Sequence, residues 1–96
     1  MKQYNNLIPT RTYQIIRDGE TIGQETAHSA AEAIGLWKYH QDGQPAHLID
    51  YDLEMLPYKI YDGGEYITIS YGHSLPEAYG RYIRQQPDWQ EHYTVA

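Results

Sequence analysis

The chain has 96 residues, a formal net charge of −6 and no cysteine. A chain of this length forms one small domain, so we expect a single domain over residues 1–96. Without cysteine it has neither disulfides nor a thiolate metal site, which favours the reducing cytoplasm. No apolar run approaches the roughly 18 residues of a membrane span, and the first residues lack the apolar core of a signal peptide, so we expect no membrane association.

The charge is distributed unevenly along the chain. Residues 1–48 hold four basic and five acidic side chains, whereas residues 49–96 hold three basic and eight acidic ones. Such a field repels nucleic acid and anionic lipid and favours a basic protein surface as partner. The chain also has eleven tyrosines and no phenylalanine. Because tyrosine combines apolar area with a polar tip, this surplus indicates either a contact surface or a shallow core in which tyrosine replaces phenylalanine.

The first predicted elements are an arm and a β-hairpin. Residues 1–10, with two asparagines and a proline, are typical of a loosely ordered arm. Residues 12–17 are rich in β-formers, Asp18-Gly19 is a hairpin signal, and residues 20–27 return as the second strand. The core-facing side chains of this hairpin are predicted to be Tyr13, Ile15 and Ile22.

A helix is predicted to follow over residues 30–40. Ser29 and Glu32 form a capping box, with the serine as N-cap and the glutamate at the third helical position. Gly35 lies inside this helix, where glycine costs about 1 kcal/mol relative to alanine. We interpret it as a point of close backbone approach, the alternative being inheritance from an ancestor without present need. The predicted buried stripe consists of Ala30, Ala33, Ile34 and Trp37.

The next predicted strand covers residues 46–56, where apolar and acidic residues alternate. Asp50, Asp52 and Glu54 then fall on one face, about 6.6 Å apart, which is twice the rise per residue. A row of carboxylates at this spacing can imitate a run of backbone phosphates and occupy a groove built for DNA or RNA. The alternative is a solvated strand face that protects a sheet edge by charge.

The second half of the chain predicts the same elements in the same order. Residues 58–61 and 65–72 form a hairpin around Asp62-Gly63-Gly64, a helix spans residues 75–85 behind a capping box of Ser74 and Glu77, and residues 91–96 form a last strand. Gly80 takes the place of Gly35 in this helix. The predicted core-facing residues are Tyr58, Ile60, Ile67, Ala78, Tyr79, Tyr82 and Ile83.

These similarities amount to an internal repeat with a constant offset of 45 residues. Between residues 13–41 and 58–86, 11 of 29 aligned pairs are identical, against roughly two expected by chance. A unit used twice predicts an α+β fold: an internally duplicated ββαβ unit (ββαβ-ββαβ) with pseudo-twofold symmetry, in which two helices pack on antiparallel sheet. Repeat 1 is predicted to cover residues 12–56 and repeat 2 residues 57–96.

Histidines are the only candidate metal ligands of note. His28, His47, His73 and His92 fall into two pairs at the 45-residue offset. Imidazoles near a pseudo-twofold axis could form a tetrahedral zinc site together with carboxylates. None of them stands at the local spacing of a metal motif, however, so we expect no cofactor and keep zinc as an alternative.

No catalytic motif is present. The sequence has no cysteine nucleophile, no nucleophile elbow and no phosphate-binding loop. Ser29 and Ser74 adjoin histidines in sequence, but both are explained as helix caps, and we expect no enzyme.

In general character, a cysteine-free, acidic, tyrosine-rich domain of fewer than a hundred residues built by duplication, the chain resembles the small inhibitors by which phages and mobile elements block host defence, anti-CRISPR proteins above all. The likeness is one of size, charge and economy and transfers no functional residues. It implies a cytoplasmic, non-enzymatic protein that binds a nucleic-acid-handling nuclease and denies it guide or target.

The resulting hypothesis is an acidic inhibitor that binds a basic protein surface and does not bind nucleic acid directly. The alternatives are a small cytoplasmic adaptor or regulatory module of unspecified oligomeric state, and a histidine-based zinc protein. The candidate partner-binding residues are Asp50, Asp52, Glu54, Tyr61 and Tyr66.

Overall fold

The computed structural model describes residues 8–46 and 51–96, which form an α+β fold. The α+β part of the predicted fold class is therefore confirmed. None of the helices in this part of the chain has both the length and the apolar character that crossing a bilayer requires. The elements, in chain order, are β1 (Arg11–Arg17), β2 (Glu20–Ala27), α1 (Ala30–Gln41), β3 (Leu56–Asp62), β4 (Glu65–Gly72), α2 (Leu75–Arg84), α3 (Pro87–His92) and β5 (Tyr93–Val95).

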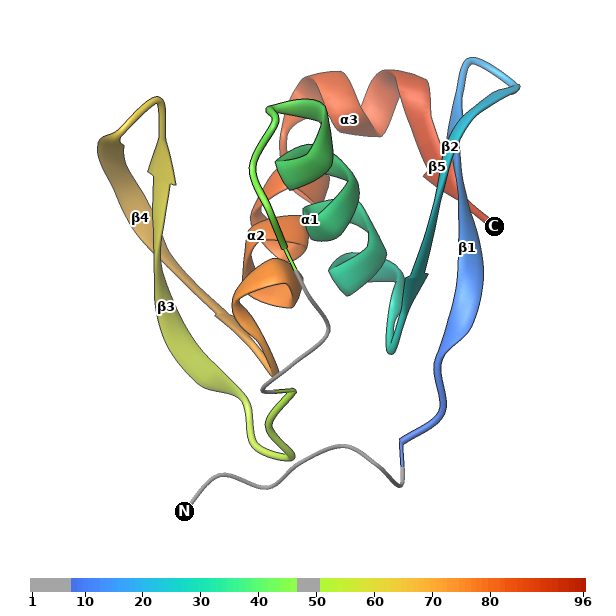
Figure 1. Ribbon diagram of the computed structural model, residues 1–96. Coiled ribbons are helices and arrows are strands. Elements are labelled where there is room, and N and C mark those ends of the chain that lie inside the picture. Colours follow the sequence, from blue (N-terminus) through green and yellow to red (C-terminus); the bar gives the residue numbers. More distant parts are fainter. Residues whose placement is uncertain (1–7, 47–50) are drawn as a thin grey trace.

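The described elements form two antiparallel sheets with helices α1 and α2 between them (Figure 1). The three-stranded sheet has the order β2-β1-β5 and lies beside α1, whereas β3 and β4 form a two-stranded sheet beside α2. The two predicted helices thus pack on antiparallel sheet, and this sheet is divided into two. The fold also includes a third helix that was not predicted, α3. Pro87 is its first residue, where a missing backbone N–H leaves no hydrogen bond unmade.

The strand predicted over residues 46–56 is wrong for the residues that the structure describes. Residues 51–55 form no strand, the chain bends at Leu53 and Glu54, and β3 begins only at Leu56. The physical reason is local, because the backbone N–H of Glu54 donates to the Asp52 carboxylate over 3.0 Å. Such a side-chain turn competes with the extended conformation. Asp50 lies outside the described residues.

Both predicted hairpins are confirmed, and they have the same register. β1 pairs with β2 from Arg11↔Ala27 to Arg17↔Glu20, and β3 pairs with β4 from Leu56↔Gly72 to Asp62↔Glu65. Each contains one irregularity at the same place, after Ile15 in β1 and after Ile60 in β3. This β-bulge adds one residue to the partner strand.

The bulges explain an error in the predicted core. Ile15 and Ile60 are buried as expected, but Ile22 and Ile67 are each 39% exposed. In both hairpins this isoleucine is the extra residue of the bulge, since the partner positions on either side of it are consecutive on β1 or β3. Alternation along the strand is broken at a bulge, so counting by twos placed these side chains on the wrong face.

Helices α1 and α2 cross where their two interior glycines lie. A Cβ atom added to Gly35 would overlap the carbonyl oxygen of Pro76, and one added to Gly80 would overlap that of Ala31. The predicted close backbone approach is therefore confirmed. The buried surface of α1 is wider than the predicted stripe, because α2 covers one side of α1 and the three-stranded sheet covers the other; Ala31, Glu32, Ala33, Ile34, Gly35 and Leu36 are all buried.

Candidate functional site

The chemistry-bearing side chains gather in two places, a buried polar network at the N-termini of α1 and α2 and the outer face of the β3–β4 hairpin. The network begins with the predicted caps. The Ser29 hydroxyl accepts from the Glu32 backbone N–H over 3.1 Å, and the Ser74 hydroxyl accepts from that of Glu77 over 3.2 Å. Both predicted helix starts are thus confirmed.

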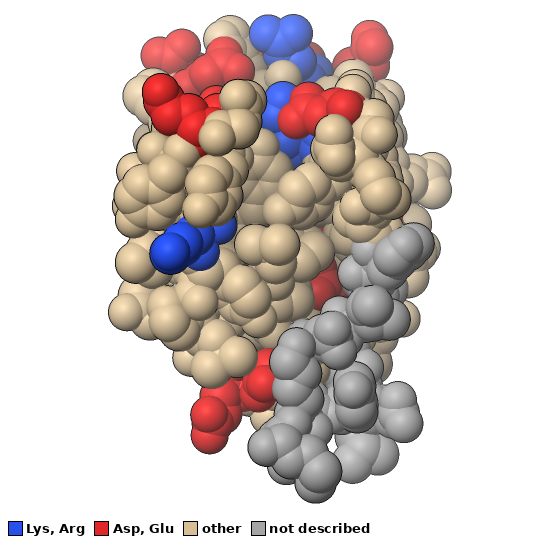
Figure 2. Space-filling model, turned by 60° about the vertical axis from the view of Figure 1, so that its left-hand side comes forward, with Lys and Arg blue, Asp and Glu red and all other residues tan. Residues whose placement is uncertain are grey.

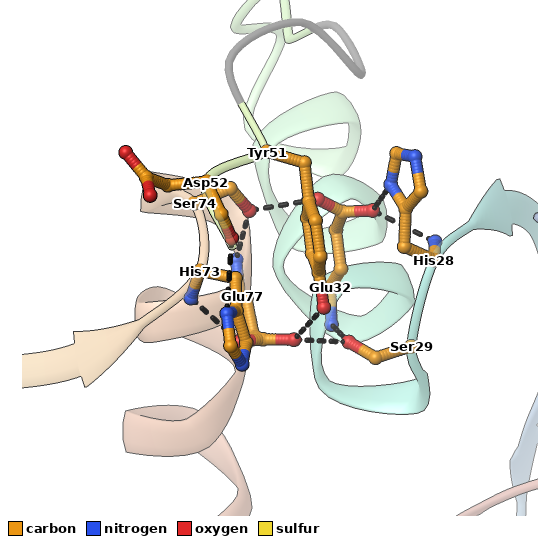
Figure 3. A network of polar contacts seen from close by, with 8 residues as sticks. All are labelled: His28, Ser29, Glu32, Tyr51, Asp52, His73, Ser74 and Glu77. Atoms are coloured by element: carbon orange, nitrogen blue, oxygen red, sulfur yellow. Dashed lines mark hydrogen bonds and ion pairs between the residues drawn. The ribbon is translucent and has the colours of Figure 1, made fainter. Parts of the chain in front are cut away.

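The same serines also connect the two helices (Figure 3). Ser29 donates to the Glu77 carboxylate over 2.6 Å, and Ser74 donates to the Glu32 carboxylate over 2.7 Å. Each glutamate uses its other oxygen to accept the backbone N–H of the residue before its own N-cap, His28 or His73. Each capping box therefore closes one residue earlier than in the usual motif, which leaves a carboxylate oxygen for the neighbouring helix.

Tyr51 joins this network from the bend before β3. Its hydroxyl donates to Glu77 over 2.9 Å, and its ring stacks between His28 and His73, with centroids 4.3 and 5.2 Å away. Burial, together with the Glu77 carboxylate, raises the pKa of the Tyr51 hydroxyl well above its ordinary value. The hydroxyl is therefore a proton donor throughout the physiological range.

Serine, histidine and glutamate side chains are the catalytic groups of many acyl-transfer enzymes. Here a substrate has no access to them, because most are buried and their hydrogen bonds are already made. Glu32, Ser74 and Glu77 are between 1% and 4% exposed. Each serine hydroxyl donates to a carboxylate and accepts a helix N–H, so its donor is already used. The geometry suits the network to holding the two helix ends together rather than to reacting with a substrate.

The histidines considered as zinc ligands do not come together. His28 contacts the Glu32 carboxylate through Nδ1 over 2.6 Å, and His73 contacts the Asp52 carbonyl oxygen over 3.0 Å. His92 lies at the β1–β2 turn, where its Nδ1 is 2.9 Å from Asp18. His47 lies outside the described residues. Across residues 8–46 and 51–96, no three histidine or acidic side chains gather as metal ligands do.

The second place is the outer face of β3–β4, turned away from the helices. Tyr61 and Tyr66, both predicted to bind a partner, are cross-strand neighbours whose rings meet edge to face with centroids 5.9 Å apart. They are 52% and 50% exposed. Sequence reasoning missed two further residues of this face, Ile69 and Tyr71, because alternation counted from Ile67, the extra residue of the bulge, places both on the inner face. We call the outer aromatic face the set of Pro57, Lys59, Tyr61, Tyr66, Ile69 and Tyr71.

The equivalent face of β1–β2 has a different chemistry. At the same register positions it carries Thr12, Gln14 and Ile16 on β1, opposite Thr26, Gln24 and Thr21 on β2. An antiparallel sheet with one solvated face ordinarily places polar residues there. The β1–β2 hairpin follows this rule at every outer position except Ile16, and the β3–β4 hairpin does not follow it.

Acidic side chains flank the outer aromatic face. Asp52 and Glu54 lie in the bend before β3, and Asp62 and Glu65 end the facing strands at the turn. Figure 2 shows a largely uncharged surface with acidic groups toward its upper and lower ends, basic groups among the acidic ones at the upper end and one basic group at mid-height on the left. The regular strand spacing predicted for the carboxylates of residues 50–54 is not formed in the described part of that segment. Acidic residues nevertheless adjoin the aromatic ones.

Comparison of the chain with protein-family models, with curated proteins and with solved structures found no match.

Proposed function

We propose that this protein is a non-enzymatic protein-binding module that docks on a basic protein surface through the outer aromatic face. The observation that carries the proposal is the contrast between two hairpins of the same register: β3–β4 presents three half-exposed tyrosines and Ile69 on its outer face, whereas the outer face of β1–β2 has Ile16 as its one apolar residue. Folding does not require the outer residues of β4 to be apolar, since β2 forms with Thr21, Gln24 and Thr26 at the positions of Tyr66, Ile69 and Tyr71.

The composition of the face supports binding to a protein. Contiguous exposed apolar side chains on a small protein mark interaction surfaces. Tyrosine is enriched at such surfaces because its ring buries a large area at a low entropic cost while its hydroxyl still finds a partner. Tyr71, at 55% exposed, is available in the same way as Tyr61 and Tyr66.

The charge supports a basic partner. The chain carries a net charge of −6, and acidic residues lie at both ends of the face. Complementary charge at the rim of an interface mainly accelerates association and excludes partners of like charge. An apolar centre with an acidic rim therefore favours a surface with apolar side chains ringed by lysine or arginine.

We also infer that the two halves derive from one duplicated unit related by a pseudo-twofold axis. The bounds of β1 and β2, offset by 45, are those of β3 and β4, and the bulges, caps and glycine contacts recur in pairs. On this view the second copy acquired the aromatic face while the first kept polar residues. The comparison between copies is then an internal control for function.

The proposal is tested by giving β3–β4 the outer residues of β1–β2. The variant Tyr66→Thr/Ile69→Gln/Tyr71→Thr takes its residues from positions 21, 24 and 26. We expect it to melt within a few degrees of the natural protein and to lose partner capture from the native host. Its control is Thr21→Ala/Gln24→Ala/Thr26→Ala, which should retain capture. Equal capture by both variants would exclude the face as the binding surface.

A second candidate is the inhibitor of a nucleic-acid-handling nuclease, favoured by the acidic residues beside the face. Here the carboxylates of Asp50, Asp52 and Glu54 occupy the basic groove that guide or target would fill. Their change to Asn, Asn and Gln should leave the melting temperature nearly unchanged, because the amides keep the size of the side chains and an acceptor for the Glu54 N–H. It should weaken partner binding, and the natural affinity should fall as salt rises. Binding that survives both treatments would contradict this candidate and leave the aromatic docking proposal standing.

A further inference from the structure

The outer edge of β1 is filled by the C-terminal part of the chain. β5 pairs with β1 at Ile15–Arg17, and beyond it Gln14 and Ala96 exchange two backbone hydrogen bonds of 2.9 and 3.0 Å. The preceding helix α3 buries the Trp89 side chain in a cluster with Ile34 and Ile83. A strand and an aromatic side chain therefore close this edge together.

At the corresponding place beside β3, the described residues line a groove. Its volume is about 640 Å³, and it lies between the C-terminal end of α1 and the β3–β4 turn. Two of its lining residues, Tyr79 and Lys38, are the 45-residue counterparts of Ile34 and Ile83, which pack around Trp89. Within residues 8–46 and 51–96, β3 pairs with no strand other than β4. The further residues that line the groove include Tyr39, Asp42, Tyr61 and Asp62.

The backbone at this edge is oriented to accept a strand. Gln14 directs its N–H and C=O toward β5, away from β2. Because β3–β4 has the same register as β1–β2, its counterpart Lys59 directs the same groups away from β4, and Tyr61 does so two residues later. Pro57, which has no N–H, stands at the matching position two residues earlier. Proline within a sheet is found where its nitrogen faces outward from an edge strand.

We propose that the protein binding partner adds an extended segment to the outer edge of β3 and inserts an aromatic side chain into the groove beside Tyr79. This deepens the proposed function and rests on it. Strand addition obtains affinity from backbone hydrogen bonds and specificity from side-chain pockets. The segment α3–β5, which places Trp89 four residues before Tyr93, supplies the spacing between the aromatic anchor and the added strand.

The acidic lining of the groove indicates which charged residues the partner's extended segment carries. Asp42 and Asp62 line the groove, and the one lysine there, Lys38, is paired with Asp42 over 3.1 Å. Glu65 lies opposite Asp62 at the turn. A segment that carries lysine or arginine beside its aromatic anchor matches this lining, whereas a second copy of this acidic chain matches it poorly.

The test uses a synthetic peptide with the sequence of residues 86–96 in which lysine replaces Asp88 and Glu91. Titrated into the full-length protein, it should shift the NMR signals of Lys38 and Tyr61 and slow the exchange of the Lys59 and Tyr61 amides. Replacement of its tryptophan by alanine should weaken binding at least about tenfold, as expected for a buried aromatic anchor.

Two matched pairs separate backbone pairing from side-chain docking. In the protein, Lys59→Pro should abolish peptide binding and Lys59→Ala should not, since only the first removes the outward N–H. In the peptide, N-methylation at the residues equivalent to Thr94 and Ala96 should abolish binding, because these pair with Ile16 and Gln14 in the natural strand. N-methylation at the equivalents of Tyr93 and Val95 should be tolerated. The peptide pair gives the answer even if Lys59→Pro does not fold.

Each other outcome overturns the inference. Strand addition would be excluded if the peptide did not bind, or if its affinity were the same with and without the N-methyl groups. If the peptide of natural sequence bound as tightly as the lysine-substituted one, or if the protein dimerised through this edge, the occupant would be a second copy of the chain and not a basic partner. If capture of the native partner is lost in Tyr66→Thr/Ile69→Gln/Tyr71→Thr but kept in Lys59→Pro, the proposed function stands and the strand addition fails.

Discussion

The β1–β2 and β3–β4 hairpins share strand lengths, register and bulge position, yet their outer faces differ in almost every residue. Thr12, Gln24 and Thr26 on one correspond to Pro57, Ile69 and Tyr71 on the other. The inner positions explain why the folds agree, because Ile15 and Ile60 are both buried against the helices. The difference teaches that the fold depends on the inner faces, and that the outer faces are free to serve function.

A second difference follows the helices. After α2 the chain continues into α3 and β5 and closes the edge of β1, whereas after α1 the described residues 42–46 form no helix or strand, and Asp42 and Gln44 line a groove beside β3. Function is therefore expected in the half of the molecule whose sheet has fewer strands. The predictions below test where the two halves behave alike and where they do not.

The largest expected effect is common to both halves. Gly35→Ala and Gly80→Ala should each destabilise the fold by about 3 kcal/mol or more, at the upper end of the overpacking range. The added methyl group overlaps a backbone carbonyl of the facing helix, and the gain of about 1 kcal/mol in helix propensity does not offset this. Denaturant melts measure the effect. Stabilisation of either variant would show that the helices do not cross at these glycines.

The caps should be unequal between the halves. Ser29→Ala and Ser74→Ala each remove a cap worth about 1 kcal/mol and a hydrogen bond to a buried carboxylate worth roughly 1.5–3 kcal/mol. Ser74→Ala should cost more, because the Glu77 oxygen that Ser29 serves also accepts from Tyr51.

Tyr51→Phe supplies the control for this asymmetry. In that background the losses caused by Ser29→Ala and Ser74→Ala should become similar when the free energy of unfolding is measured. If Ser29→Ala lowered the free energy of unfolding by the same amount with Phe or Tyr at position 51, Tyr51 would not share the Glu77 carboxylate with Ser29.

The outer faces should matter little for stability. Thr26→Tyr on β2 and Tyr71→Thr on β4 exchange equivalent residues, and each should change the free energy of unfolding by no more than about 0.5 kcal/mol, as for exposed positions in general. Only Tyr71→Thr should reduce partner binding. A large destabilisation by Tyr71→Thr would indicate that the aromatic face belongs to the folding core.

The smallest effect concerns the contact between His92 and Asp18 at the β1–β2 turn. The hydrogen bond to Asp18 raises the pKa of His92 above its ordinary 6.5. A raised pKa means that the contribution to stability is present below pH 6.5 and is lost as the pH rises through the higher value of the folded state. NMR titration should find the His92 pKa above 6.5 in the natural protein and near 6.5 in Asp18→Asn. An unchanged pKa would show that the pair does not form in solution.

Local signals in the sequence predicted much of the fold. Ser29 and Ser74 marked the helix starts, the Asp-Gly turns marked both hairpins, and Gly35 and Gly80 marked the helix crossing. The bulges at Ile22 and Ile67 were not predictable from alternation, because a bulge adds a residue without a composition signal. The bend at Asp52 was missed because one side-chain hydrogen bond outweighed a strand-like pattern.

Less of the candidate site was predictable. Tyr61 and Tyr66 were predicted to bind a partner because the chain has more tyrosine than a small core can bury. The structure places them on one face with Ile69 and Tyr71. Asp52 was predicted to belong to a regular row of carboxylates on a strand. In the structure it lies in the bend before β3, beside the outer aromatic face. The groove beside β3 depends on where the chain goes after α1, which no residue pattern indicated.

The most direct test of the central claim is photo-crosslinking from two equivalent positions. A photoreactive phenylalanine analogue is placed at residue 69 on β4 or at residue 24 on β2, which correspond at the 45-residue offset. In the native host, the protein substituted at residue 69 should crosslink to a basic protein, with a yield that falls as salt rises, and the protein substituted at residue 24 should not. Crosslinks of equal yield from both positions, or from residue 24 alone, would contradict the assignment of binding to the β3–β4 face.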